Sequence, residues 1–226
     1  MRYDNIVAGR FIERPNRFIA KVEIAGVEET VHVKNTGRCK ELLVPGATVY
    51  LQHFPGGARK TKYDLIAVKK GELLTNMDSQ APNKVVKEWL LEQEPFGKIT
   101  FLKPEYTYGK SRFDFYLEMG ERKMFIEVKG VTLEDDGVVL FPDAPTERGL
   151  KHVEELINCV EKGYEAVVLF VVQMAKAKYF TPNRKTQPDF ADALVKASAA
   201  GVKVLAYTCS VSDDSLAIDK PLKVRS

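Results

Sequence analysis

The chain has 226 residues, 45% of them hydrophobic and 29% charged, which is enough apolar material for one large domain or two modest ones. Its three cysteines, Cys39, Cys159 and Cys209, are odd in number and include no Cys-x-x-Cys pair, which argues against a disulfide framework or a zinc site. The longest apolar run, Ala166–Val172, is too short to cross a bilayer, and the N-terminus has no apolar signal segment. We therefore expect a cytosolic protein.

The formal charge of +3 is unevenly divided along the chain. Residues 1–76 hold 13 Lys/Arg and 8 Asp/Glu, a net charge of +5, and residues 77–226 hold the other 21 and 23, a net charge of −2. A basic first part joined to a near-neutral second part is typical of a nucleic-acid-binding module attached to a carboxylate-bearing site.

Residues 1–75 have the pattern of an all-β domain, with turns marked by Gly, Pro and Asn. The expected strands are Ile6–Phe11, Phe18–Ile24, Thr30–Val33, Thr48–His53 and Asp64–Val68. A short helix is expected at Arg38–Leu43, between the third and fourth strands. Five strands with a helix at that place predict the small Greek-key barrel of the OB-fold, which binds single strands through aromatic and basic side chains.

Several basic or aromatic side chains of this domain are candidates for nucleic-acid contacts. They are Arg17, Phe18, Arg38, Arg59, Lys60 and Lys62. The alternative is that the aromatic residue belongs to the barrel core and the basic run is a solvated loop. His32, which points away from its valine neighbours, and the following Asn35-Thr36-Gly37 turn either bind a ligand or only hydrogen-bond to each other.

A domain boundary is expected near residues 75–83, where polar residues and Pro82 interrupt the pattern, so the second domain would span residues 83–226. Asn83 is expected to cap a helix that runs to Glu94. Glu88 flanks the apolar stripe of this helix. Its position on the helix predicts an exposed residue.

The segment Ser111–Gly130 predicts a β-hairpin, because apolar and polar residues alternate on both sides of a short turn at Gly120-Glu121. This register places Asp114 opposite Glu127, with Lys129 on the same face, and groups Phe113 with the other apolar residues on the opposite face. Two carboxylates favour a hard divalent cation such as Mg²⁺ or Mn²⁺, and the lysine would act on an attacking water or on a phosphate. The alternative is the solvated side of a half-exposed hairpin.

The remaining chain predicts an α/β arrangement with a mixed sheet. A strand at 99–108 precedes the hairpin, and a helix follows at about Glu147–Lys162, in which Arg148 and His152 share a polar face. Asp143 and Thr146 are candidates for shaping the start of that helix. A strand at Ala166–Val172, covered on both faces, a helix at 189–200 and a strand at 202–209 complete the order.

The hairpin resembles the core of the PD-(D/E)xK nuclease superfamily, with an acidic residue on one strand and Glu-x-Lys on the next. More narrowly, the chain resembles the bacterial and archaeal sugar fermentation stimulation protein A family. The matching segments are Asn16-Arg17-Phe18, His32 with Asn35-Thr36-Gly37, Asn83 with Lys87-Glu88, Ser111–Phe115, Ile126–Lys129, Phe141–Ala144, Thr146–Gly149 and Lys151-His152. The resemblance implies an OB-like domain joined to a nuclease-like domain, DNA as partner, and Asp114, Glu127 and Lys129 as catalytic residues. It also implies Glu88 as a further metal ligand, Arg112 and Arg148 as substrate contacts, and His152 either as a support of the site residues or as a substrate contact. The alternative for Arg148 and His152 is a polar ridge that faces solvent.

Three functions remain open at this point. The first is a metal-dependent nuclease that binds DNA through its OB-like domain. The second is a non-catalytic DNA-binding protein, such as a regulator, that keeps the fold and its acidic patch. The third is a nucleotide or RNA binder that uses His32 and the turn after it.

Overall fold

The computed structural model describes residues 1–35, 37–57 and 59–225. The first domain contains strands β1 (Ile6–Asn16), β2 (Ile19–Ile24), β3 (Val27–Val33), β4 (Thr48–His53), β5 (Tyr63–Lys70) and β6 (Leu73–Asn76). The second contains α1 (Ala81–Gln93), β7 (Phe101–Tyr108), β8 (Ser111–Met119), β9 (Arg122–Val131), β10 (Leu133–Asp135), β11 (Val138–Phe141), α2 (Glu147–Glu161), β12 (Glu165–Val172), β13 (Tyr179–Pro182), α3 (Pro188–Ala199), β14 (Lys203–Val211) and β15 (Leu216–Leu222).

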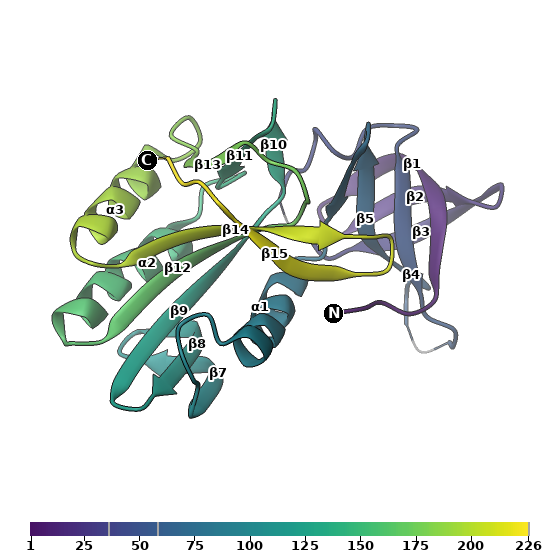
Figure 1. Cartoon of the computed structure of the whole chain (residues 1–226). Helices are drawn as coiled ribbons and strands as arrows, with labels where there is room; N and C mark the ends of the chain where they lie inside the picture. The colour runs from purple at the N-terminus through teal and green to yellow at the C-terminus, as the bar shows by residue number, and fades with distance from the viewer. Residues whose placement is uncertain (36, 58, 226) are drawn as a thin grey trace.

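The first domain is the predicted OB-like barrel (Figure 1). Its strands follow the order β3-β2-β1-β4-β5-β6, and parallel pairing of β3 with β5 closes the barrel around an apolar core. The helix expected at Arg38–Leu43 is wrong: this segment forms only turns, in which the amide of Leu43 donates to the carbonyl of Cys39. Cys39 has a φ of 47°, which a right-handed helix cannot contain.

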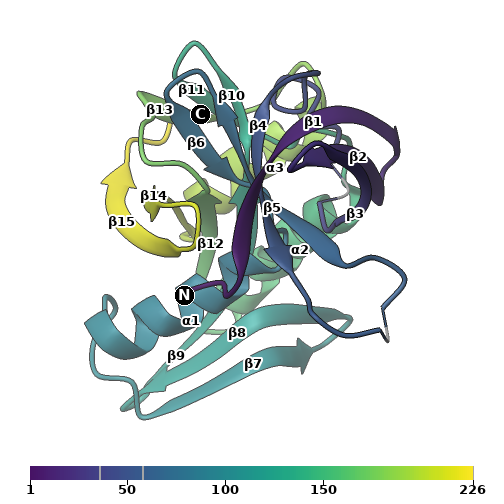
Figure 2. The same ribbon diagram turned by 90° about the vertical axis from the view of Figure 1, so that its right-hand side faces the viewer.

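The second domain is built on a mixed six-stranded sheet of order β15-β14-β12-β9-β8-β7, as the sequence predicts for the fold class. The central strand β12 is parallel to both β9 and β14, and β7, β8 and β15 are antiparallel to their neighbours. Helices α2 and α3 pack on one face of this sheet and α1 packs on the other, as the two views show (Figures 1 and 2).

The apolar run in β12 explains these two layers. Val168 and Phe170 pack toward α2 and α3, whereas Val167 and Leu169 pack toward α1, and all four are fully buried. Successive side chains of a strand point to opposite faces, so a strand covered on both faces must be apolar at every position. The sequence prediction for this strand is confirmed.

Several short strands escaped the sequence analysis. Strands β10, β11 and β13 form a separate three-stranded sheet, and β15 adds an antiparallel edge strand to the main sheet. Each has few residues or an irregular apolar pattern, so periodicity alone gives little signal. Within the described residues, no helix combines the length and apolar composition needed to span a membrane.

The barrel and the α/β domain are joined by polar contacts as well as by the chain. Asp143 Oδ2 accepts hydrogen bonds from the backbone amides of Arg38 (2.6 Å) and Cys39 (3.2 Å), and Lys70 Nζ donates to Glu134 Oε2 (2.8 Å). Of the two residues expected to shape the start of α2, only Thr146 does so, because its Oγ1 accepts from the amide of Gly149. Asp143 instead anchors the barrel.

Candidate functional site

The hairpin of β8 and β9 has the predicted register near its turn. Met119 lies opposite Arg122 and Phe115 opposite Ile126, with Gly120 at a φ of 66°. Both faces of the hairpin are covered at its centre, since Tyr116 packs under α2 and Leu117 under α1. The reading of this hairpin as half-exposed is therefore wrong.

The alternation of β8 breaks at Asp114. Phe113 packs in the core beneath α2 together with Tyr116, whereas Phe115 packs in the core beneath α1, so the predicted grouping of Phe113 with Phe115 is wrong. The neighbouring strand is also irregular here, because Glu105, which would face Asp114, has a φ of 51° and is skipped in the register. The regular alternation of side chains in β8 is therefore broken at the residue that carries the carboxylate.

Asp114 consequently turns its carboxylate toward β9 and α1. Oδ2 accepts a hydrogen bond from the backbone amide of Val128 at 2.8 Å, and Oδ1 accepts one from Asn83 Nδ2 at 2.8 Å. The regular ladder ends one pair earlier, at Phe115 and Ile126, so Asp114 is held beside Glu127 by its side chain and not by strand pairing.

Glu127 lies almost fully buried, with 3% of its surface exposed. Its Oε1 accepts hydrogen bonds from Lys129 Nζ at 2.6 Å and from His152 Nδ1, on α2, at 2.5 Å. Its Oε2 is also buried and has no hydrogen-bond partner among the described residues. A buried carboxylate oxygen without a partner is costly, so this atom is poised to bind a ligand.

The pKa values of the two carboxyl groups are shifted in opposite directions. Burial raises the pKa of Asp114, and the negative charge of Glu127 raises it further, against the hydrogen bonds from Val128 and Asn83. Burial would also raise the pKa of Glu127, but the hydrogen bond from His152 and the charge of Lys129 outweigh it and lower this pKa. Glu127 is therefore ionised at neutral pH, and Asp114 is the group whose ionisation the site resists.

We expect this tuning to appear in the pH dependence of stability. Asp114 has a higher pKa in the folded chain than the ordinary 3.8 of an unfolded one, so its ionisation destabilises the fold as pH rises from about 4 through the folded value. The free energy of unfolding of Asp114→Asn should therefore improve relative to wild type across that window, measured by urea unfolding at several pH values.

The same substitution at Asp135 serves as the control, because that residue lies on the surface of the same domain. A pH trend that both variants share would not be specific to Asp114. If the stability of the wild type relative to Asp114→Asn grows with rising pH, the raised pKa of Asp114 is contradicted.

The side chains of this site include oxygen atoms of the kind that a divalent cation binds. Among the described residues, no group of three or more His, Cys, Asp or Glu side chains is arranged to hold a metal ion. Asp114 and Glu127 would therefore be the protein ligands, and Glu127 Oε2 offers a buried, unpaired oxygen. One or two carboxylates with several retained waters is the coordination that Mg²⁺ prefers, so the residues fit this class of cation.

Helix α1 contributes Asn83 to this site, and Glu88 has other contacts. Glu88 Oε2 accepts a hydrogen bond from the amino group of Met1 at 2.6 Å, and the same amino group donates to the carbonyl of Leu216. The helix begins two residues before the predicted cap, at Ala81, and Asn83 lies within its first turn. Asn83 is therefore free to bind Asp114 (2.8 Å), a contact that required the tertiary fold to be known.

The predicted substrate contacts of the second domain come together beside these carboxylates. Arg112, Arg148 and His152 line one cleft of about 560 Å³, where the start of β8 meets the first turns of α2. A second cleft of about 350 Å³ is lined by Gly130, the residue after Lys129, and by Gly37 of a barrel loop. The first cleft reaches the carboxylates through His152, which contacts Glu127, and the second reaches β9 at Gly130, next to Lys129.

The predicted nucleic-acid residues of the barrel are of two kinds. Phe18 is 51% exposed, with the Arg17 guanidinium 5.8 Å from its ring centre, and Arg38 and Lys60 are exposed as well. The alternative that Phe18 is a core residue is therefore wrong. The other kind already has partners within the barrel.

The partnered basic residues are Arg59 and Lys62. Arg59 lies over the ring of Phe54 at 3.9 Å and donates to Asp64 at 2.5 Å, and Lys62 lies 3.8 Å from Glu29. An arginine held between an aromatic ring and a buried carboxylate is fixed in place, so its role in the barrel is at least partly structural.

His32 belongs to the same group. Its Nδ1 lies 3.3 Å from Asp64 Oδ1, and Lys34, which the sequence analysis missed, lies 3.1 Å from Asp64 Oδ2. These contacts favour hydrogen bonding over ligand binding for His32. Thr36, in the turn predicted to accompany it, lies outside the described residues. Gly37 donates its amide to Asn35 Oδ1, as expected for a hydrogen-bonded turn.

We expect Phe18 to contribute a stacking contact to a single strand. Because the ring is half exposed, Phe18→Ala should leave the unfolding temperature nearly unchanged while weakening single-strand affinity about fivefold or more, since base–aromatic stacking contributes about 1–3 kcal/mol per base. Fluorescence anisotropy measures this. Phe101→Ala, at a 46% exposed position of the second domain, is the matched control. Equal affinities for the two variants would refute a role for Phe18.

Comparisons with known proteins agree with this architecture. The family model described as "SfsA N-terminal OB domain" matches residues 12–77, and the one described as "Sugar fermentation stimulation protein RE domain" matches residues 80–215. A relative named "Sugar fermentation stimulation protein homolog", from Desulfitobacterium hafniense (strain DSM 10664 / DCB-2), is 61% identical over 216 residues, or 96% of this chain and 94% of that protein. One of the same name from Ruminiclostridium cellulolyticum is 54% identical over 225 residues, covering 100% of both.

A solved structure has the same fold over the whole chain. It is described as the structure of Pyrococcus furiosus SfsA in complex with Ca²⁺, and it is 28% identical in sequence. It superimposes with a TM-score of 0.86 and covers 100% of this chain and 98% of that one.

Proposed function

The chain belongs to the sugar fermentation stimulation protein A family, and we propose that it is a DNA-binding phosphodiesterase that requires Mg²⁺ or Mn²⁺. The observation that carries this proposal is the group of Asp114, Glu127, Lys129 and His152, in which one buried carboxylate oxygen has no partner among the described residues. The barrel would bind the nucleic acid and present it to this group.

The cation would be held by Asp114 and Glu127. Its chemistry there would be charge neutralisation and Lewis-acid polarisation of the phosphoryl oxygens. The Ca²⁺ in the description of the Pyrococcus furiosus structure supports a divalent cation in this fold, since Ca²⁺ and Mg²⁺ share a preference for oxygen ligands.

Lys129 would stabilise the negative charge that develops on the scissile phosphate. Its ammonium group has three N–H donors, and the described residues engage it at Glu127 Oε1, which leaves donors for a phosphoryl oxygen or for the attacking water. Because its side chain is only 13% exposed, this charge acts in a low-dielectric setting where it is screened less than in water.

His152 would fix Glu127 in position. An ionised carboxylate can only accept a hydrogen bond, so His152 Nδ1 carries the proton in this contact. In hydrolysis a water oxygen bonds to phosphorus, the P–O ester bond breaks, and the leaving oxygen gains a proton. His152 lines the cleft, and its second ring nitrogen, Nε2, is the candidate acceptor for the proton released by the water.

A cleavage assay tests the proposal. Single- and double-stranded DNA and RNA would be incubated with purified protein in Mg²⁺, in Mn²⁺ and in EDTA. Metal-dependent cleavage that is lost in Glu127→Gln supports the proposal, and cleavage that survives EDTA and this substitution contradicts it.

The second candidate is a DNA-binding protein or regulator without turnover. It is favoured by the satisfied state of the site, in which both oxygens of Asp114 and one oxygen of Glu127 already have protein partners. DNA binding by the wild type, with no cleavage under any metal condition, would support this alternative.

A further inference from the structure

The cleft beside Glu127 has a composition of its own. It lies between the start of β8 and the first turns of α2, with a volume of about 560 Å³. Four of its lining residues, Lys110, Arg112, Arg148 and Lys151, are basic, and one described lining residue, Glu147, is acidic. Like charges gathered around one hollow repel each other unless an anion offsets them, so the lining predicts an anionic ligand.

The basic side chains of this cleft are available to a ligand. All four are exposed, and Lys110, Arg148 and Lys151 form no ion pair with any residue that the structure describes. Arg112 lies 3.8 Å from Glu105, but both side chains are more than half exposed, and such a surface pair contributes little. The cations are therefore not committed to holding the fold together.

Two further observations at the same cleft point to an anion. The hydroxyl of Ser111, a residue that is 97% buried, is itself buried and has no hydrogen-bond partner in the described chain. The cleft also includes the first turn of α2, a helix of 15 residues whose N-terminal amides and macrodipole favour negative charge. A phosphate group could accept from Ser111 Oγ and from the basic side chains together.

His152 connects this cleft to the candidate catalytic site. The residue lines the cleft, and its Nδ1 makes the 2.5 Å hydrogen bond to Glu127 Oε1. A phosphate in the cleft would thus be separated from the carboxylates by one imidazole ring.

We propose that this cationic cleft binds a phosphate group of the nucleic-acid strand, other than the phosphate held at Asp114 and Glu127. The inference rests on the proposed function for the identity of the ligand, but it concerns binding and not cleavage. The group is either a phosphodiester within the strand or a monoester at its end, which share the chemistry that the cleft recognises.

The test uses the full chain with Arg148→Gln and Lys151→Gln combined. Binding to an oligonucleotide of about 12 nucleotides, as single strand and as duplex, is measured by fluorescence anisotropy in EDTA at several salt concentrations. We expect the affinity at about 100 mM salt to fall tenfold or more. The slope of log affinity against log salt is negative, and its magnitude should fall by about 0.7 for the single strand or about 0.9 for the duplex for each phosphate contact removed.

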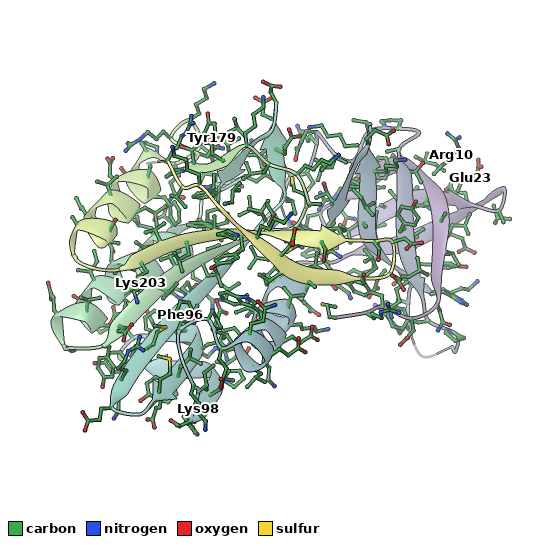
Figure 3. The ribbon with its side chains drawn as sticks, viewed as in Figure 1. Arg10, Glu23, Phe96, Lys98, Tyr179 and Lys203 are labelled. Carbon is green, nitrogen blue, oxygen red and sulfur yellow. The ribbon has the colours of Figure 1, made fainter. Side chains whose placement is uncertain are left out.

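Two controls separate a site from a general loss of charge. Lys98→Gln with Lys123→Gln also removes two positive charges, but from exposed positions at the hairpin-turn end of the sheet. Figure 3 shows Lys98 far from the barrel. Lys123 lies opposite Glu118, which is about 20 Å along β8 from Ser111. This double variant should therefore leave the slope of log affinity against log salt unchanged. Arg148→Lys with Lys151→Arg keeps both charges and should retain most of the affinity.

The outcomes also separate this inference from the proposed function. If the wild type never cleaves but the cleft variant alone loses affinity and slope, the cleft binds phosphate and the nuclease proposal fails. If the wild type cleaves but cleft and control variants bind alike, or if the wild type has no measurable affinity for either oligonucleotide, the cleft inference is overturned.

A final comparison identifies the source of the phosphate. Oligonucleotides with a 5′-phosphate, with a 3′-phosphate and with hydroxyl ends are bound to the wild type and to the cleft variant. Tighter binding of one phosphorylated form, lost in the cleft variant, identifies a terminal monoester. Equal binding of all three forms, weakened alike in the cleft variant, identifies a phosphodiester within the strand.

Discussion

Glu127→Ala and Asp114→Ala should each weaken Mn²⁺ binding, whereas Lys129→Ala should leave it intact. The two carboxylates are the oxygen ligands of the proposed cation site, and Lys129 occupies only Glu127 Oε1 with its ammonium group. Isothermal titration calorimetry of the four proteins with MnCl₂ measures this directly. If cleavage occurs, all three substitutions should lower its rate by a factor on the order of a hundred or more, since each removes a metal ligand or a charge that stabilises the transition state.

Glu88→Ala is the matched control for this experiment. Glu88 is also a glutamate of the second domain and a predicted metal ligand, but in the structure it binds the amino group of Met1. Its removal should leave Mn²⁺ affinity and cleavage near wild type, and a large loss of both would restore it as a ligand. Absence of Mn²⁺ binding by the wild type, together with cleavage that survives all three site substitutions, would remove the basis of the nuclease proposal.

Phe125→Ala should give the largest loss of stability among simple core substitutions in the second domain. Phe125 is fully buried in β9, and its ring lies within 6 Å of five other aromatic rings. Truncation of a buried phenylalanine to alanine costs about 3–5 kcal/mol, because transfer free energy is lost and a cavity is left. For a chain of this length, such a loss lowers the unfolding temperature by about 10 °C.

Thermal unfolding followed by circular dichroism measures the effect. Phe101→Ala makes the same change on the same sheet, at an edge strand where the residue is 46% exposed, and should lower the unfolding temperature by only a degree or two. Similar shifts for the two variants would mean that the aromatic cluster does not hold this domain together.

Local sequence patterns predicted the elements whose physics is local. The Gly120-Glu121 turn predicted the hairpin register, because a two-residue turn leaves no freedom in which residues face each other. The unbroken apolar run Ala166–Val172 predicted a strand covered on both faces, because no polar side chain offers it a solvent face. The alternation and turn residues of the first 75 positions likewise predicted five strands and a barrel.

The carboxylate and lysine of the candidate site were also within reach of the sequence. Glu127 and Lys129 are two residues apart on β9, whose alternation is regular here, so they share a face, and they are in contact at 2.6 Å. Resemblance to the nuclease core indicated Asp114. Tyr116 and Phe125, on the same face, were a signal that the sequence analysis missed, because two large aromatic side chains favour a covered face.

Only the tertiary structure decided what surrounds these groups. The contacts of Asn83 with Asp114 and of His152 with Glu127 join residues that are 25 or more positions apart. The broken alternation at Asp114 accompanies a backbone irregularity in the neighbouring strand. Local periodicity encodes neither feature. Asp143 illustrates the same limit, since a residue just before a helix has a strong local role as a cap, yet here it binds barrel amides more than a hundred positions away. A polar side chain near the end of a helix or strand can form any of several hydrogen bonds. Which one it forms depends on the domain that packs against it.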